Sequence, residues 1–187
     1  GNVERVDAGG RLLFSPRQTR YSLARLLARE LTIYQPAAFF RRELALDLGG
    51  WNPEIPYVPD TDLWFRLAFR SEVVQSEAVL AAYRTHPDQR DSHRDRIYGN
   101  YLRMLELSRE LASAPLNLRL AAKAGAALLK LRYGGPWTHA QLTAAAWKAL
   151  LCRPALWFSP VLPEHRLVPG YFALTGFRRP LLDGKRP

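Results

Sequence analysis

Two acidic residues stand at a boundary that suits acid–base chemistry. Asp60 and Asp62 follow a proline-rich stretch, residues 51–59, and open a segment with helical periodicity. A carboxylate at such a junction can be held rigidly and still face a cleft, as a general base must. Taken alone, the position favours a simpler role, in which Asp60 caps the helix by accepting a first-turn backbone N–H. Asp62 is predicted to pair with Arg66 one turn later, and this structural role is the favoured one for it.

Aromatic residues near these carboxylates have two possible roles. Trp51 follows Gly49-Gly50 in the proline-rich stretch, where its ring could either join the core or stack on the apolar face of a sugar. Trp64 shares a helical face with Leu67, and this spacing predicts burial.

A histidine stands at the predicted exit of an extended segment. His86 precedes a proline, and Arg84 and Arg90 bring permanent positive charge to the same region. A neutral imidazole can ligate a metal, and an imidazolium can donate hydrogen bonds to a phosphate. A structural or exposed histidine is the more common alternative at such a position.

The elements that must position these residues alternate between extended and helical in the first half of the chain. Apolar patterning and turn residues predict a hairpin of residues 3–6 and 12–14, a helix over 22–31 capped by Ser22, and a buried strand over 33–40. A helix over 41–48, ended by Gly49-Gly50, is predicted to follow. The last two elements are a helix over 61–69 and an extended segment over 73–83.

After about residue 90 the pattern becomes helical. Helices are predicted over residues 92–112, 116–131 and 139–151, and the proline-containing tail from Arg153 is left unassigned. The predicted fold class is therefore α/β, followed by a mainly α-helical C-terminal region. The predicted boundary divides the chain into residues 1–93 and 94–187.

The charge is concentrated in the second half. The chain of 187 residues carries a net charge of +10, of which residues 1–90 contribute 12 − 11 = +1 and residues 91–187 contribute 15 − 6 = +9. Such a half could face nucleic acid, anionic lipid or only solvent. No apolar run reaches the roughly 18 residues that span a bilayer. The single cysteine, Cys152, excludes an internal disulfide and fits a reducing compartment.

Three groups of residues in the first half occur in a characteristic order. They are Gln35–Arg42 followed by Gly49-Gly50-Trp51, the acidic segment Pro59–Leu67, and Tyr83–Gln89 followed by Ser92. In this order they resemble the C-terminal half of the catalytic domain of family 2 glycosyltransferases, which have the GT-A fold. That family typically shows an aromatic-Arg-Arg strand end, Gly-Gly-Phe/Trp, Glu-Asp-x-Asp-Leu-Trp-x-Arg-Leu and Tyr-Arg-x-His. The resemblance covers residues 1–93, and Gly1–Phe14 resembles the family's mid-domain turn.

The resemblance implies an enzyme that transfers a sugar from a nucleotide-sugar donor to a carbohydrate or lipid-linked acceptor, as in the synthesis of cell-envelope polysaccharide. Asp60 would deprotonate the acceptor hydroxyl, and the anomeric carbon would invert. The other implied site residues are Gly50, Trp51, Asp62 and Trp64 on the acceptor side, with Arg84 and His86 near the diphosphate and His86 as a candidate metal ligand.

Two departures from the family pattern shape the expectation. Pro59 stands where the family often has Glu, and the nucleotide-binding half with its Asp-x-Asp metal site is not in the sequence. Asp60-Thr61-Asp62 is not that site, because it follows the Gly-Gly-Trp loop. We therefore expect a truncated chain whose parent uses Mg²⁺ or Mn²⁺, and we expect this chain alone to be inactive because leaving-group charge would not be stabilised.

Other functions stay open at this stage. A non-catalytic carbohydrate-binding or scaffold protein of the same fold would keep the motifs without turnover. A nucleic-acid-binding module would suit the basic half, but the sequence shows no zinc ligands, RNA-binding aromatic motif or helix-turn-helix, so nucleic acid is not an expected partner. The expected location is cytoplasmic, with peripheral attachment to an anionic membrane through residues 94–187 as a further hypothesis.

Overall fold

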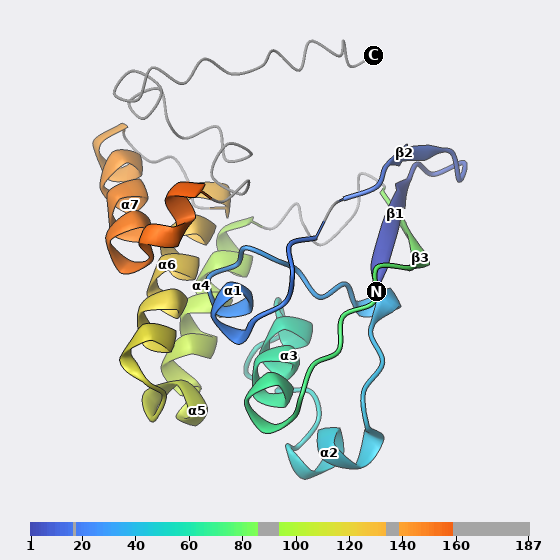
Figure 1. Cartoon of the computed structure of the whole chain (residues 1–187), viewed down its shortest axis with the longest axis horizontal. Coiled ribbons are helices and arrows are strands. Elements are labelled where there is room, and N and C mark those ends of the chain that lie inside the picture. The colour runs from blue at the N-terminus through green and yellow to red at the C-terminus, as the bar shows by residue number, and fades with distance from the viewer. Residues whose placement is uncertain (17, 86–93, 134–138, 159–187) are drawn as a thin grey trace.

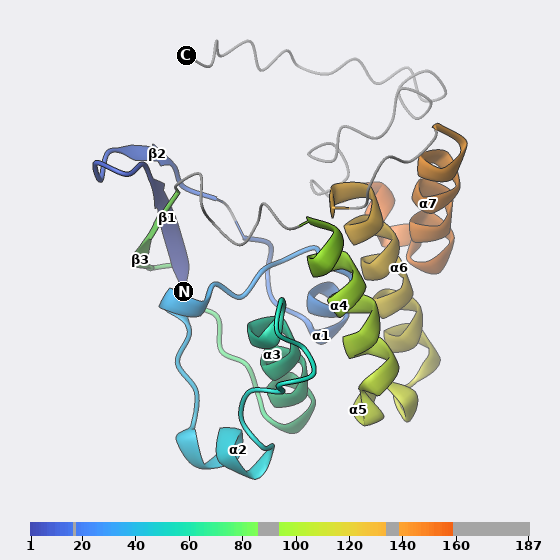
Figure 2. The same cartoon turned by 180° about the vertical axis from the view of Figure 1, so that it is seen from behind.

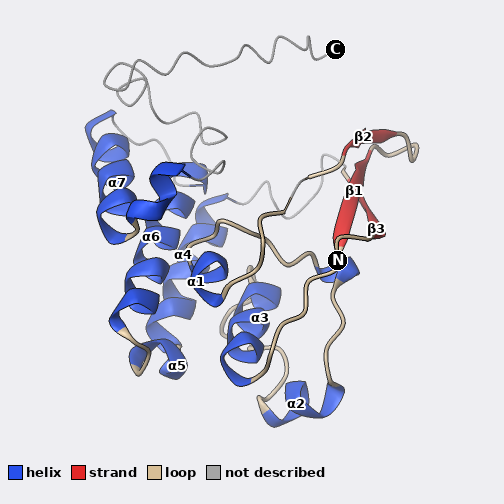
Figure 3. Cartoon of the chain, viewed as in Figure 1, coloured by secondary structure: helices blue, strands red, loops and turns tan. Residues whose placement is uncertain are grey.

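The computed structural model describes residues 1–16, 18–85, 94–133 and 139–158. Within these residues the protein is a mixed α/β structure with a small three-stranded sheet and seven α-helices, and helix predominates. The sheet lies at one end of the molecule and helices α6 and α7 at the other, as Figures 1 and 2 show from opposite sides. Figure 3 shows how little of the chain is strand.

The sheet has the order β2-β1-β3, formed by β1 (Asn2–Val6), β2 (Leu12–Phe14) and β3 (Val79–Arg84). β1 and β2 form the predicted antiparallel hairpin, and Gly10 adopts a φ of +87° in its turn. β3 pairs with β1 in parallel and begins later than the extended segment predicted from residue 73.

Apolar side chains of this sheet are exposed to solvent. The exposed residues include Leu12, Leu13 and Phe14 of β2 and Val79 and Leu80 of β3. Parallel strand pairs occur mostly in sheets whose two faces are covered. Val3 and Val6 of β1 are buried, so cover is lacking at β2 and at the start of β3 rather than at the central strand.

The predicted strand over residues 33–40 is wrong. Residues Gln35–Ala37 form a short 3-10 helix, η1, with Pro36 in its first turn. Proline has no N–H to donate to a strand ladder, and its fixed φ suits the start of a helical turn. Phe39 and Phe40, expected to be buried, are exposed.

The two helices that flank the proline-rich stretch are α2 (Arg42–Asp47) and α3 (Pro59–Arg70). α2 ends as predicted, because Gly49 and Gly50 adopt φ values of +82° and +62°, which favour glycine. α3 begins two residues before the predicted start, with Pro59 at its first position.

Ser22 caps α1 (Leu23–Leu27) as predicted, accepting the backbone N–H of Arg25 at 3.2 Å. The helix predicted over residues 92–112 is instead divided into α4 (Arg94–Leu107) and α5 (Arg109–Ala112). The division falls at Ser108, whose hydroxyl accepts the N–H of Leu111 at 3.1 Å and so caps a new helix.

The predicted helices of the C-terminal half are present. They are α6 (Leu116–Tyr133) and α7 (His139–Cys152), followed by the 3-10 helix η3 (Pro154–Phe158). None of the helices within the described ranges has both the length and the apolar character needed to cross a bilayer.

The main core joins both halves of the chain. Leu27 of α1, Phe65 of α3 and Tyr101 of α4 belong to one buried cluster that also includes residues of α6. α6 approaches α1 so closely at Gly125 that an added Cβ would lie 2.2 Å from the carbonyl oxygen of Leu27. The boundary predicted at residue 93 stays a prediction, and the core is continuous across it.

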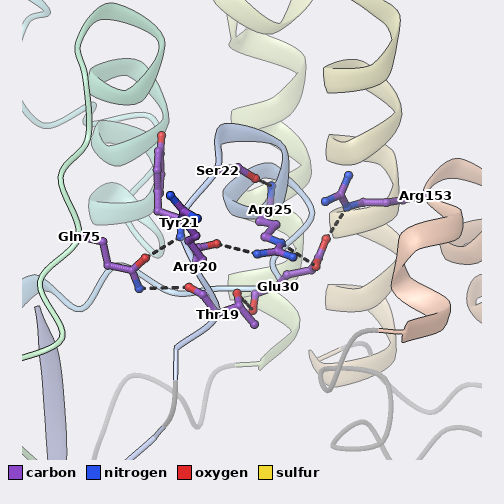
Figure 4. A network of polar contacts seen from close by, with 8 residues as sticks. All are labelled: Thr19, Arg20, Tyr21, Ser22, Arg25, Glu30, Gln75 and Arg153. Carbon is purple, nitrogen blue, oxygen red and sulfur yellow. Dashed lines mark hydrogen bonds and ion pairs between the residues drawn. The ribbon is translucent and has the colours of Figure 1, made fainter.

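A buried carboxylate also links the two halves. Glu30 pairs with Arg25 at 3.8 Å and, on its other oxygen, with Arg153 beyond α7. Figure 4 shows this pair beside a second contact, in which the side chain of Gln75 accepts the N–H of Tyr21 at 2.6 Å and donates to the Thr19 carbonyl at 3.1 Å. Ion pairing of Glu30 satisfies a charge that would otherwise be costly to bury.

Candidate functional site

One arginine organises the candidate site. Arg66 of α3 donates to Asp62 through Nε at 3.0 Å and Nη2 at 2.5 Å, which confirms the predicted pair. The same guanidinium donates to the carbonyl oxygens of Leu48 and Gly50, each at 2.7 Å. Asp62, Arg66 and the two carbonyls, which we call the Arg66 clamp, fix the glycine turn after α2 to the middle of α3.

The planar guanidinium suits this geometry, because its donors are arranged in a rigid fork. Asp62 is buried and Arg66 is mostly buried, so water cannot easily replace either partner. The clamp therefore determines where the chain leaves Gly50 and enters the loop that carries Trp51.

The two carboxylates of the acidic segment have different environments. The Asp62 carboxylate is used by Arg66, whereas Asp60 is half-buried and accepts only the backbone N–H of Thr61, at 2.8 Å, among the contacts of the described residues. The helix cap is Val58, so the prediction of Asp60 as the N-cap residue is wrong. Pro59 has no N–H and begins the helix, which moves Asp60 to the second helical position.

The loop between Gly50 and α3 is held against α4 by three polar contacts. Asn100 accepts the backbone N–H of Tyr57 at 3.1 Å, Arg96 donates to the Tyr57 hydroxyl, and Arg103 pairs with Glu54 at 3.4 Å. Arg66 holds the N-terminal end of this loop at Gly50, and the three contacts hold its later part at Glu54 and Tyr57. The segment that carries Trp51 and leads to Asp60 is thus anchored at both ends.

Sequence reasoning missed this set of loop contacts. Arg96, Asn100 and Arg103 lie at i, i+4 and i+7 and so share one face of α4. A polar stripe at this spacing is a recognisable signal for a helix face that meets polar partners. The stripe alone does not identify the loop as that partner.

The two tryptophans of the motifs lie in opposite environments. Trp51 is 47% exposed, which leaves its ring open to a ligand. Trp64 is buried in a cluster with Ala45, Leu63 and Leu67, as its helical spacing predicted, and packs edge-on against Phe40 with ring centroids 5.5 Å apart. A direct acceptor contact for Trp64 stays a prediction.

A largely apolar pocket of about 660 Å³ lies beside Trp64. Its lining includes the aromatic residues Tyr21, Phe39 and Phe40 and the cations Arg41 and Arg70. Of the predicted site residues the structure describes, Trp64 alone contributes to this lining, so the pocket and the Asp60 region are separate features.

The residues expected near a diphosphate are only partly described. Arg84 lies at the end of β3, exposed, and its guanidinium donates to the carbonyl of Ala8 in the hairpin turn. His86, Arg90 and Ser92 lie outside the described residues. No group of three or more His, Cys, Asp or Glu side chains in the described part of the chain is arranged to hold a metal ion.

Comparison with known proteins identifies no family. No family model matches the chain, and no solved structure matches it. The chain is similar to the uncharacterized protein MT1568 of Mycobacterium tuberculosis (strain CDC 1551 / Oshkosh), with 49% identity over 47 residues. The match covers 25% of this chain and 15% of that protein.

Proposed function

We propose that this chain is the acceptor-side half of a glycosyltransferase of the family 2, GT-A type, with Asp60 as the general base. The observation that carries the proposal is that the Asp62 carboxylate is held in an ion pair and the Asp60 carboxylate is not. Arg66 neutralises Asp62, whereas no basic side chain in the described part of the chain lies within ion-pair distance of Asp60. A general base must also reach the acceptor hydroxyl, and of the two carboxylates Asp60 is the one that is partly exposed and not held in an ion pair.

In the proposed reaction, a carboxylate oxygen of Asp60 accepts the proton of an acceptor hydroxyl. The hydroxyl oxygen attacks the anomeric carbon of the donor sugar as the bond from that carbon to the nucleoside diphosphate breaks. The electron pair of the broken bond leaves with the diphosphate, and the configuration inverts. The Arg66 clamp positions this chemistry indirectly by holding the loop between Gly50 and Asp60 in place.

A divalent cation would stabilise the charge of the leaving diphosphate. The described residues offer no suitable set of ligands, so the proposed steps do not pass through a metal held by them. We place the cation and the nucleotide in an upstream half that precedes Gly1 in the parent protein. The exposed apolar side chains of β2 and β3 are consistent with a sheet that further structure of such a half would cover.

The exposed ring of Trp51 supports a carbohydrate acceptor, because the apolar C–H face of a sugar can stack on an indole. The same ring also favours a second candidate, a carbohydrate-binding protein without turnover. The two functions differ in what they do to a donor: only the transferase releases a nucleoside diphosphate. A peripheral position at the inner face of a membrane is part of the proposal, because it would bring a lipid-linked acceptor within reach.

The test is a donor screen with the full-length parent protein. The protein is incubated with a panel of UDP-, GDP- and dTDP-sugars, Mg²⁺ or Mn²⁺, and membrane extract as acceptor, and nucleoside diphosphate release is measured. We expect release with at least one donor, and none from the 187-residue chain alone. Carbohydrate binding without release from any donor would favour the non-catalytic candidate and overturn the transferase.

A further inference from the structure

The C-terminal helical pair belongs to a stretch with no acidic residue. Between Glu110 and Glu164, residues 111–163 contain no Asp or Glu, over 163 − 110 = 53 residues. The same stretch contains six cations: Arg119, Lys123, Lys130, Arg132, Lys148 and Arg153. Because the stretch itself supplies no anion, its positive charge is offset only by acidic residues elsewhere in the chain, as Glu30 offsets Arg153.

α7 has an exposed apolar stripe. Ala140, Ala144, Trp147 and Leu151 lie at i, i+4, i+7 and i+11 and therefore share one face of the helix. All four are exposed, with Trp147 at 46% and Leu151 at 77%. We call these four residues the α7 stripe.

The opposite face of α7 is occupied by packing within the protein. Ala149 and Leu150 are buried in a cluster with Ala124 and Leu128 of α6. Figures 1 and 2 both show α6 and α7 side by side at the end of the molecule away from the sheet. The α7 stripe thus lies on the side of α7 opposite to the residues that pack on α6.

Three cations of α6 and α7 are exposed to solvent. They are Lys148, which is next to Trp147, and Arg119 and Lys123 on α6. Arg153 is excluded from this set because Glu30 uses it in the core. Lys148 therefore brings positive charge next to the exposed indole, and Arg119 and Lys123 add exposed positive charge on the neighbouring helix.

We propose that the α7 stripe, with Lys148, Arg119 and Lys123, binds the surface of an anionic bilayer. An apolar helix face with Trp and Leu inserts at the headgroup boundary, and basic residues beside it are attracted to anionic lipids. A nucleic acid would use the cations but not the apolar stripe, so the observations favour lipid. Binding to the bilayer does not depend on the proposed function. Only the purpose of that binding does, which is to hold the protein where a lipid-linked acceptor lies.

The test is flotation of the 187-residue chain with vesicles of phosphatidylcholine alone and with vesicles that also contain phosphatidylglycerol. We expect binding to the anionic vesicles and little to the neutral ones. Two variants address the two components: Lys123→Glu with Lys148→Glu for charge, and Leu151→Glu for the stripe. Each is expected to weaken binding by about tenfold or more, the first by reversing charges that attract anionic lipid and the second by placing a charge in the inserting face.

The matched controls lie outside α6 and α7. Val74→Glu places the same charge at an apolar side chain that is 91% exposed, and Arg42→Glu reverses an exposed charge on α2. Both controls are expected to bind as the wild type does, and circular dichroism of every variant checks that the helices are intact. Because the assay contains no sugar donor, its result is independent of whether Asp60 is a base.

Three results would overturn the inference. They are the absence of binding to anionic vesicles, equal binding to both vesicle types, and a folded Leu151→Glu variant that still binds as tightly as the wild type. Duplex DNA provides a competition experiment. If it binds the protein more tightly than the anionic vesicles do and displaces the protein from them, the surface binds nucleic acid instead.

Discussion

Replacing Arg66 by Met tests whether the Arg66 clamp holds the candidate site together. The methionine keeps most of the apolar stem but leaves the Asp62 carboxylate, whose side chain is 9% exposed, without its cation. The carbonyls of Leu48 and Gly50 also lose their donors. Breaking a buried ion pair from one side costs about 3–5 kcal/mol.

The expected cost for this variant is about 3 kcal/mol, at the lower end of that range. Arg66 is itself 16% exposed, and the glycine turn lies near the surface, so water can reach part of the vacated site. The assay is urea-induced unfolding followed by tryptophan fluorescence and circular dichroism. Adding Asp62→Asn to Arg66→Met removes the orphaned charge, and the double variant should recover part of the lost stability.

The control is Arg70→Met on the same helix. Arg70 is 60% exposed and pairs with Glu110 at 3.6 Å, so its loss should cost less than about 1 kcal/mol. If Arg66→Met is no more destabilised than Arg70→Met, the reasoning about the clamp is wrong.

Three further predictions concern the core. Gly125→Ala should lose about 2 kcal/mol or more, because the new Cβ would lie 2.2 Å from the Leu27 carbonyl oxygen; thermal unfolding measures this. Arg153→Met should lose about 3 kcal/mol in urea unfolding, because Glu30 is buried and loses its nearer cation. Burial raises the pKa of Tyr101, whose neutral form is therefore favoured in the folded state. Stability should fall as pH rises above the ordinary tyrosine pKa of about 10, and fall less in Tyr101→Phe.

Each of these predictions has a result that contradicts it. A Gly125→Ala variant as stable as the wild type would mean that α1 and α6 do not meet there as closely as described. An unaffected Arg153→Met variant would mean that Glu30 does not depend on that cation. Parallel alkaline unfolding curves for Tyr101→Phe and the wild type would remove Tyr101 as a source of the pH dependence.

Local patterns predicted several elements because their causes are local. The hairpin turn, the Ser22 cap, the end of α2 at two glycines and the pairing of Asp62 with Arg66 each depend on residues within a few positions. These predictions are confirmed. The Gly-Gly turn and the acidic helix start could therefore be placed on their elements from the sequence alone.

The errors arose where short signals compete. The apolar run over 33–40 has the composition of a strand, but Pro36 cannot join a ladder and the segment forms η1 instead. Ser108 interrupts a continuous helical pattern because its side chain offers the backbone an alternative partner.

Contacts between distant residues could not be read from the pattern. Arg66 reaches back to the carbonyls of Leu48 and Gly50, and Asn100 of α4 holds the backbone of Tyr57. Every residue type has a backbone carbonyl. A side chain that donates to a carbonyl therefore does not require a particular residue type as its partner, and the sequence does not show which residue that partner is.

The central claim is that Asp60 is the general base. The measurement is the rate of sugar transfer by the full-length parent protein carrying Asp60→Asn, with Asp47→Asn as the control at an exposed aspartate of α2. We predict that Asp60→Asn lowers kcat by about 10²-fold or more with little change in donor KM, while Asp47→Asn transfers at the wild-type rate. Transfer by Asp60→Asn at the wild-type kcat would contradict the assignment.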